Sequence, residues 1–109
     1  MPKTIGKGRG KPTPPSAGVL SVTGSLGAEP FQSGGAESYS IKGAGFQPNV
    51  ALWYNLANPG CCLGSYVITD AAGAFTLTRL TGTPGTYWLR LYSYTTPLVF
   101  LTGISFVVE

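Results

Sequence analysis

Three turn sequences in the second half of the chain constrain its fold more than any other feature. They are GAGFQPN at 43–49, DAAGAF at 70–75 and PGTYWLR at 84–90. Each leads into a segment in which apolar and polar residues alternate, as they do in a half-buried strand. Seven or eight such segments follow one another at intervals of roughly 8–12 residues, and no segment keeps a helical period long enough for a helix. The sequence therefore predicts an all-β sandwich of about seven strands.

Alternation within the strands predicts which side chains form the core. In the strand after the third turn, Tyr87 is expected inside and Trp88 outside, because neighbouring residues of a strand face opposite sides of the sheet. In the strand after the first turn, Trp53 and Leu52 compete for the inward position, and this choice stays open. Near the C-terminus, Gly103 indicates a bulge or a break between two short strands.

The stretch from Ser38 to Tyr94, about half of the chain, resembles the immunoglobulin-like domains of bacterial surface proteins and tailed bacteriophages. Those domains share turns of the type Gly-x-Gly-Phe-x-Pro-Asn, Asp-x-x-Gly-x-Phe and Pro-Gly-Thr-Tyr, which match the three turns of this chain. The resemblance implies an Ig-like sandwich in which Tyr87 is the tyrosine corner, with its ring in the core and its hydroxyl bonded to backbone. The residues themselves indicate that Gly73 has a positive φ and that Asp70 closes its hairpin through an Asx-type hydrogen bond.

Positive charge is concentrated at the N-terminus. Four of the seven cationic residues lie in the first eleven positions: Lys3, Lys7, Arg9 and Lys11. Glycine and proline accompany them and apolar side chains are nearly missing, so we expect residues 1–17 to be a flexible arm and residues 18–109 to be the folded domain. In one interpretation the cations of the arm bind a partner with an acidic surface, or nucleic acid; in the other the arm is only a solubilising, disordered leader.

The folded domain is poor in charge. Only 10% of the chain is charged, against roughly a quarter in an average domain. Beyond the arm, the chain has three cationic residues and four carboxylates, so the net charge of this part is near zero. A surface of this kind is prone to association, and we expect part of it to lie against a partner.

The residue types that catalysis and metal binding need are scarce. Histidine is absent, which excludes Ser–His and Cys–His nucleophile pairs and the commonest metal ligand. The carboxylates are scattered, and the only cysteines, Cys61 and Cys62, are too few for a zinc site and poorly placed for an internal disulfide. We expect a protein that is not an enzyme, with no catalytic, metal-binding or cofactor-binding residue. The sequence also shows no transmembrane helix and no signal peptide, so we expect no membrane association and a chain that starts at its own Met1.

Exposed aromatic side chains form the second candidate binding surface. The outward positions of the strand after the third turn are Trp88, Arg90, Tyr92 and Tyr94, and Tyr54 is expected to join them from another strand. Aromatic side chains on a sheet face bind sugars, bases or proteins. Nucleic-acid binding is not expected, because Arg90 alone supplies positive charge there.

Two functions of different classes remain. The leading hypothesis is a structural accessory protein of a bacteriophage virion, a capsid decoration (cement) protein whose partner is a capsid protein or another virion structural protein. The alternative is a carbohydrate-binding or cell-surface-binding module of a tail fibre or an adhesin. Whether the chain forms a homo-oligomer is left open.

Overall fold

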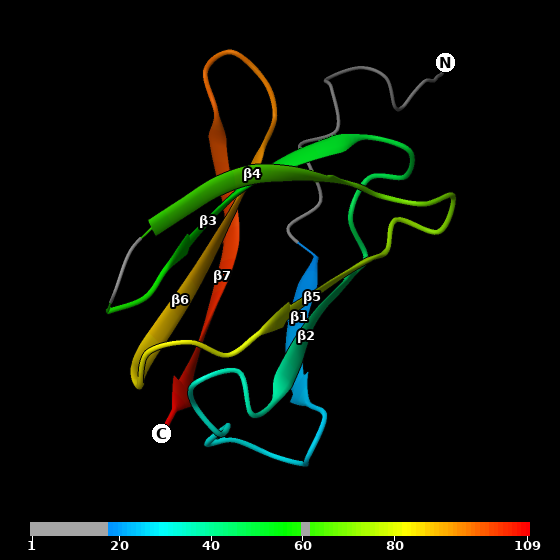
Figure 1. The fold of residues 1–109 in the computed structure, drawn as a ribbon. Helices are drawn as coiled ribbons and strands as arrows, with labels where there is room; N and C mark the ends of the chain where they lie inside the picture. Colours follow the sequence, from blue (N-terminus) through cyan, green and yellow to red (C-terminus); the bar gives the residue numbers. More distant parts are fainter. Residues whose placement is uncertain (1–17, 60–61) are drawn as a thin grey trace, which may run out of the picture.

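The computed structural model describes residues 18–59 and 62–109, and within them the chain forms seven strands and no helix (Figure 1). The strands are β1 (Val19–Gly24), β2 (Ser38–Ala44), β3 (Ala51–Ala57), β4 (Cys62–Ile68), β5 (Phe75–Leu80), β6 (Gly85–Ser93) and β7 (Val99–Val108). The predicted all-β fold of about seven strands is confirmed.

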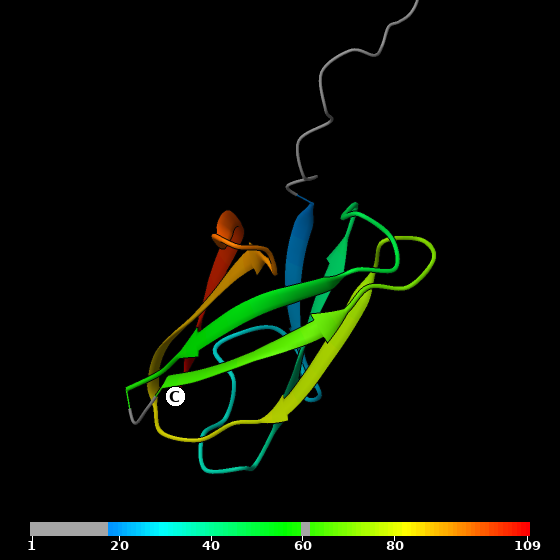
Figure 2. The same cartoon turned by 90° about the horizontal axis from the view of Figure 1, so that it is seen from above.

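The strands form two antiparallel sheets packed face to face (Figure 2). One sheet has the order β1-β2-β5 and the other has the order β4-β3-β6-β7. The chain passes between the sheets after β2, β4 and β5, which is the Greek-key connectivity of an Ig-like sandwich. In this chain the fourth strand pairs with β3 and so enlarges the sheet that contains β6 and β7.

The core fills the space between the two sheets, and most of it comes from alternate residues of the strands. Its buried hydrophobic members are Phe31, Tyr39, Ile41, Phe46, Leu52, Tyr54, Leu56, Phe75, Tyr87, Leu89, Leu91, Phe106 and Val108. At the end of the sandwich nearer the C-terminus, Tyr39 lies against Phe106 and Tyr87, with ring centroids 4.8 and 6.1 Å apart. Such tilted and edge-on pairs each contribute about 0.5–1.5 kcal/mol beyond the area that they bury.

Buried threonines fix two of the connections between the sheets. The Thr69 hydroxyl donates to the carbonyl of Gln47 at 2.7 Å and accepts from the Val50 N–H at 3.0 Å. The Thr81 hydroxyl donates to the carbonyl of Gln32 and accepts from a backbone N–H. Each side chain thus satisfies backbone groups that no neighbouring strand reaches.

The turn after β4 has the predicted Asx geometry. The Asp70 carboxylate accepts the N–H groups of Ala72 and Ala74 at 2.8 and 3.0 Å. Gly73 has a φ of +75°, and a Cβ there would lie 2.0 Å from the carbonyl oxygen of Phe46. Only glycine fits this position, because both the backbone conformation and the lack of space exclude a side chain.

Tyr87 has the contacts expected of a tyrosine corner. Its ring is buried, and its hydroxyl donates to the carbonyl of Thr83 at 2.8 Å and accepts from the Gly82 N–H at 3.2 Å. These bonds tie the β5–β6 connection to the core.

Two details near the second sheet differ from or refine the sequence prediction. Leu52 faces the core and Trp53 faces outward, which decides the choice that the sequence left open. The C-terminal strands are one strand, β7, whose register with β6 shifts opposite Leu91 and Tyr92. Gly103 itself pairs in register with Arg90, so no break occurs there; the extra residue is Leu101, and β7 continues through it.

Candidate binding surface

A row of aromatic side chains crosses all four strands on the outer face of the second sheet. The pairing places Tyr66 of β4 opposite Trp53, Trp53 opposite Tyr92, and Tyr92 opposite Phe100 of β7. Neighbouring strands lie about 4.8 Å apart, so the row extends over roughly 14 Å. We call the outer side chains of this sheet the aromatic face: Trp53, Tyr66, Trp88, Arg90, Tyr92, Tyr94 and Phe100.

The rings of this face pack on one another at an angle. Tyr94 lies 5.7 Å from Trp53 and 6.1 Å from Tyr66, with interplanar angles of 49° and 38°. Tyr92 meets Phe100 edge-on at 5.6 Å and 72°. Tyr66, Tyr94 and Phe100 are nevertheless 54%, 53% and 56% exposed. The face is thus an apolar ridge that is ordered by its own contacts and still open to solvent.

A hollow beside Trp88 extends the aromatic face towards the N-terminal end of β6. Its volume is about 310 Å³, and Trp88, Arg90 and Phe100 are among its lining residues. Gly103 opposes Arg90 across the β6–β7 pair, and a Cβ on Gly103 would lie 2.9 Å from the Leu89 carbonyl oxygen. The Arg90 guanidinium lies 5.7 Å from the centre of the Trp88 ring, within cation–π range. The hollow is therefore suited to an apolar side chain, with one positive charge at its rim.

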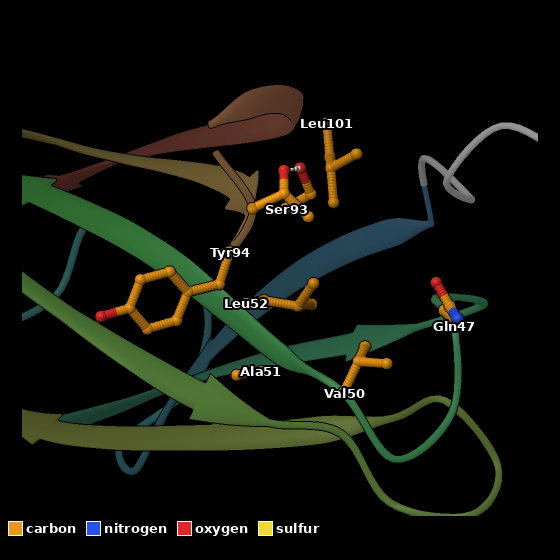
Figure 3. Close-up of a pocket in the computed structure, with 8 residues that line it drawn as sticks. Gln47, Val50, Ala51, Leu52, Ser93, Tyr94 and Leu101 are labelled. Carbon is orange, nitrogen blue, oxygen red and sulfur yellow. Dashed lines mark hydrogen bonds between the residues drawn. The ribbon is translucent and has the colours of Figure 1, made fainter. Parts of the chain in front are cut away.

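A second pocket of about 350 Å³ lies at the other end of the sandwich (Figure 3). Val50, Leu52 and Leu101 line it with apolar side chains, and the Tyr94 ring turns away from them towards the aromatic face. Ser93 supplies a hydroxyl, which already bonds to the Thr95 hydroxyl at 2.8 Å and accepts the Val99 N–H at 3.2 Å. None of its eight lining residues is charged, so the pocket offers a small apolar recess and no acid–base group.

The outer face of the three-stranded sheet is polar, unlike the aromatic face. Its outward residues are mainly serines and threonines, and Ser40 and Thr78 share a hydrogen bond of 2.8 Å across β2 and β5. Lys42 is the only charged side chain at these outward positions. The two outer faces thus differ sharply in the amount of aromatic surface that they expose.

The carboxylates that could serve chemistry hold backbone instead. Glu37 is buried and accepts the N–H groups of Leu26 and Gln32 at 3.0 and 2.7 Å. Glu29 accepts the Val107 N–H at 3.0 Å. Within residues 18–59 and 62–109, no group of three or more His, Cys, Asp or Glu side chains is placed to hold a metal ion. No helix in the same ranges is long and apolar enough to cross a membrane.

The structure brings together all four predicted residues of the aromatic patch. Trp88, Arg90, Tyr92 and Tyr94 lie on the same outer face, as the strand alternation predicted. Tyr54 was wrongly expected among them; it is 3% exposed and belongs to the core. The four cationic residues predicted in the arm, namely Lys3, Lys7, Arg9 and Lys11, lie outside the described residues.

Sequence reasoning missed three members of the aromatic face: Trp53, Tyr66 and Phe100. The signal for Trp53 was present, because Leu52, Tyr54 and Leu56 are apolar on one side of β3 and Asn55 marks the other. For Tyr66 and Phe100 no such signal exists, since both strands are apolar on both sides.

Comparison with known proteins gives no relative: no family model, no curated protein and no solved structure matches the chain.

Proposed function

We propose that this protein is a non-enzymatic structural attachment protein, and specifically a bacteriophage capsid decoration protein that binds the virion surface. The observation that carries the proposal is the aromatic face, where seven side chains with a single charge among them lie on one side of the four-stranded sheet. Exposed apolar patches of this kind mark interaction sites on soluble proteins. The Ig-like resemblance of the turns to domains of tailed bacteriophages supports the choice of a virion as the assembly.

The composition of the face fits a protein partner. Tryptophan, tyrosine and arginine are the residues that contribute most to protein interfaces, and Trp88, Tyr94 and Arg90 are exposed here. The hollow beside Trp88 provides a recess of about 310 Å³ for an anchoring side chain. Arg90 at its rim favours a partner with a carboxylate next to that anchor.

The ring geometry favours protein over carbohydrate. A sugar stacks on the open, flat face of an aromatic ring, and extended glycans need several such faces in one plane. Here Trp53 is tilted by 49° to Tyr94, and Tyr92 meets Phe100 at 72°. Rings in such contact offer edges and partial faces, which match the irregular apolar surface of a protein better than a flat sugar.

Many copies on a repeating surface make weak contacts sufficient. A capsid offers the same site many times, and a bound chain that touches two neighbouring subunits gains from effective concentration. A face of roughly 14 Å across four strands is small for a tight binary complex, whose partners each bury about 800 Å². Attachment to an ordered array removes this limitation.

The test is binding of the purified chain to virions from cells that carry its gene, measured by co-sedimentation and mass spectrometry. Arg90→Ala and Phe100→Ala should each weaken binding at least tenfold, because they remove the charge and an exposed ring of the aromatic face. Lys42→Ala and Leu80→Ala are the matched controls, since they remove one cation and one exposed apolar side chain from the three-stranded sheet. Equal losses from both pairs, or no binding to particles, would reject the proposal, and binding on a glycan array instead would establish the carbohydrate alternative.

A further inference from the structure

The outer strand of the second sheet, β4, has an unprotected edge. β4 pairs with β3 without interruption, from Ala51–Ile68 to Ala57–Cys62, so no bulge distorts it. Its sequence, CLGSYVI, contains neither a charged residue nor a proline. Natural sheets block their edges with charges, prolines, bulges or covering segments, because an open edge pairs with any available strand. Within residues 18–59 and 62–109, β4 has none of these devices.

The other sheet edges are better protected. At the C-terminal end of β7, Phe31 donates its N–H to the Val107 carbonyl at 2.9 Å, and Glu109 donates to the Phe31 carbonyl at 2.7 Å. The opposite end of β7 is irregular where its register with β6 shifts. β5 carries Arg79 in its sequence, and β1 lies against β7. β4 instead diverges from β5 beyond the turn that joins them (Figure 2).

The hydrogen-bond pattern shows which backbone groups this edge presents. The Thr69 N–H donates to the Val50 carbonyl at 2.9 Å, so position 69 bonds towards β3. In an antiparallel pair the bonding direction alternates along the strand. Odd-numbered positions of β4 therefore bond towards β3, and Gly64, Tyr66 and Ile68 direct their N–H and C=O groups away from the sheet.

We infer that two copies of the chain pair through β4, antiparallel about a twofold axis at Ser65. This register places Gly64 opposite Tyr66 of the second copy, and both are outward-bonding positions, so the hydrogen bonds of the ladder are completed. Only Ser65, on the axis, meets its own copy, and every other residue of β4 meets a different residue of the same strand. β4 is uncharged, which suits self-pairing, and an aromatic ring opposite glycine is a favourable cross-strand neighbour.

The pairing joins two four-stranded sheets into one sheet of eight strands. Tyr66 lies in β4, so the aromatic rows of the two copies become continuous across the axis. A dimer therefore presents twice the aromatic face in a fixed relation. This pairing depends only on the edge of β4 and needs no virion partner, so it is independent of the proposed virion function.

Proline scanning of the edge tests the inference. Tyr66→Pro removes an outward N–H and leaves the bonds to β3 in place, whereas Tyr66→Val removes the ring and keeps the N–H. Light scattering after size-exclusion chromatography should give the full chain about twice its mass of 11.3 kDa. Tyr66→Val should remain dimeric within a few-fold in Kd, and Tyr66→Pro should raise Kd at least tenfold. Ile68→Pro and Ile68→Val repeat the comparison at a second position.

Hydrogen exchange of the unaltered chain gives a readout that does not depend on the folding of any variant. The amides of Gly64, Tyr66 and Ile68 should exchange slowly at concentrations where the dimer forms and quickly on dilution. A monomer at every concentration overturns the inference, as does a dimer in which these amides exchange quickly. A dimer that survives both proline substitutions assigns self-association to another surface and also overturns it.

Discussion

At the scale of single residues, the neighbours Tyr87 and Trp88 differ in role: one side chain stabilises the core, and the next lies on the surface. They are neighbours in β6, yet Tyr87 is 2% exposed and Trp88 is 48% exposed. Tyr87 fills the core and bonds to the β5–β6 connection through its hydroxyl. Trp88 contacts solvent and the Arg90 guanidinium. One residue thus holds the fold together, and the next is available to a partner.

Truncation of these two neighbours should have very different costs. Tyr87→Ala should lower the free energy of unfolding by about 3–5 kcal/mol, because it leaves a large cavity in the core. Trp88→Ala should lower it by less than about 1 kcal/mol, as is usual at an exposed position. Chemical denaturation of both variants measures the difference. Equal losses would mean that Trp88 packs against the folded chain much more than its exposure indicates.

Tyr39 makes stability depend on pH in the alkaline range. Burial raises the pKa of Tyr39 from 10.0 to about 12, against the opposing charge of Arg79. Between these values the unfolded chain has lost the phenolic proton and the folded chain keeps it, so stability falls as pH rises, by at most about 1.4 kcal/mol per pH unit from this group. Below pH 10 the Tyr39 phenol is protonated in both the folded and the unfolded chain, so this group causes no loss of stability there.

Tyr39→Phe removes the titrating group and keeps the ring. Denaturant unfolding at intervals from pH 8 to pH 12 should show that the substituted protein loses stability less steeply above pH 10 than the parent does. Parallel curves over the whole range would show that Tyr39 ionises as readily in the folded protein as in the unfolded chain.

At the scale of strands and turns, the sequence predicted what depends on local chemistry. The turn at Asp70 and Gly73 follows from a side-chain hydrogen bond and a positive φ, and strand alternation correctly separated Tyr87 from Trp88. Alternation failed where a strand is apolar on both sides. β4 is the clearest case, because nothing in CLGSYVI distinguishes its inner side from its outer side.

Long-range features of the elements were also beyond the sequence. Glu37 is buried and accepts the N–H groups of Leu26 and Gln32, which lie 11 and 5 positions before it in the loop after β1, so no local motif indicates these bonds. The aromatic row exists because β4, β3, β6 and β7 are neighbours in that order, so that Tyr66 and Phe100 end up on one line. Sheet order sets this row, and a single sequence does not encode that order in any local pattern.

At the scale of the whole molecule, charge and apolar surface are unevenly distributed. Residues 18–59 and 62–109 contain three cationic residues and four carboxylates, and the other four cationic residues belong to residues 1–17. Arg90 is the only charged residue of the aromatic face. The outer face of the three-stranded sheet carries Lys42 and rows of hydroxyl groups. Two chemically different parts of the chain are therefore candidates for partner binding: the cations in the sequence of residues 1–17 and the aromatic face.

Deletion of residues 1–17 separates the contributions of these two parts. In the part of the chain that the structure describes, every fully buried hydrophobic residue lies at position 31 or later, so the shortened chain should keep its fold. Its free energy of unfolding should lie within about 1 kcal/mol of that of the full chain, or its Tm within roughly 8 °C. If the proposed attachment is right, virion binding by the full chain should weaken between 50 and 500 mM salt, because four cations are screened. Binding by the shortened chain should be weaker and should depend less on salt, because Arg90 is the only cation left at the aromatic face. Co-sedimentation at both salt concentrations, with circular dichroism to confirm the fold, measures this. Full-strength binding by the shortened chain would assign attachment to the aromatic face alone, because the described residues beyond the deletion present that surface unchanged.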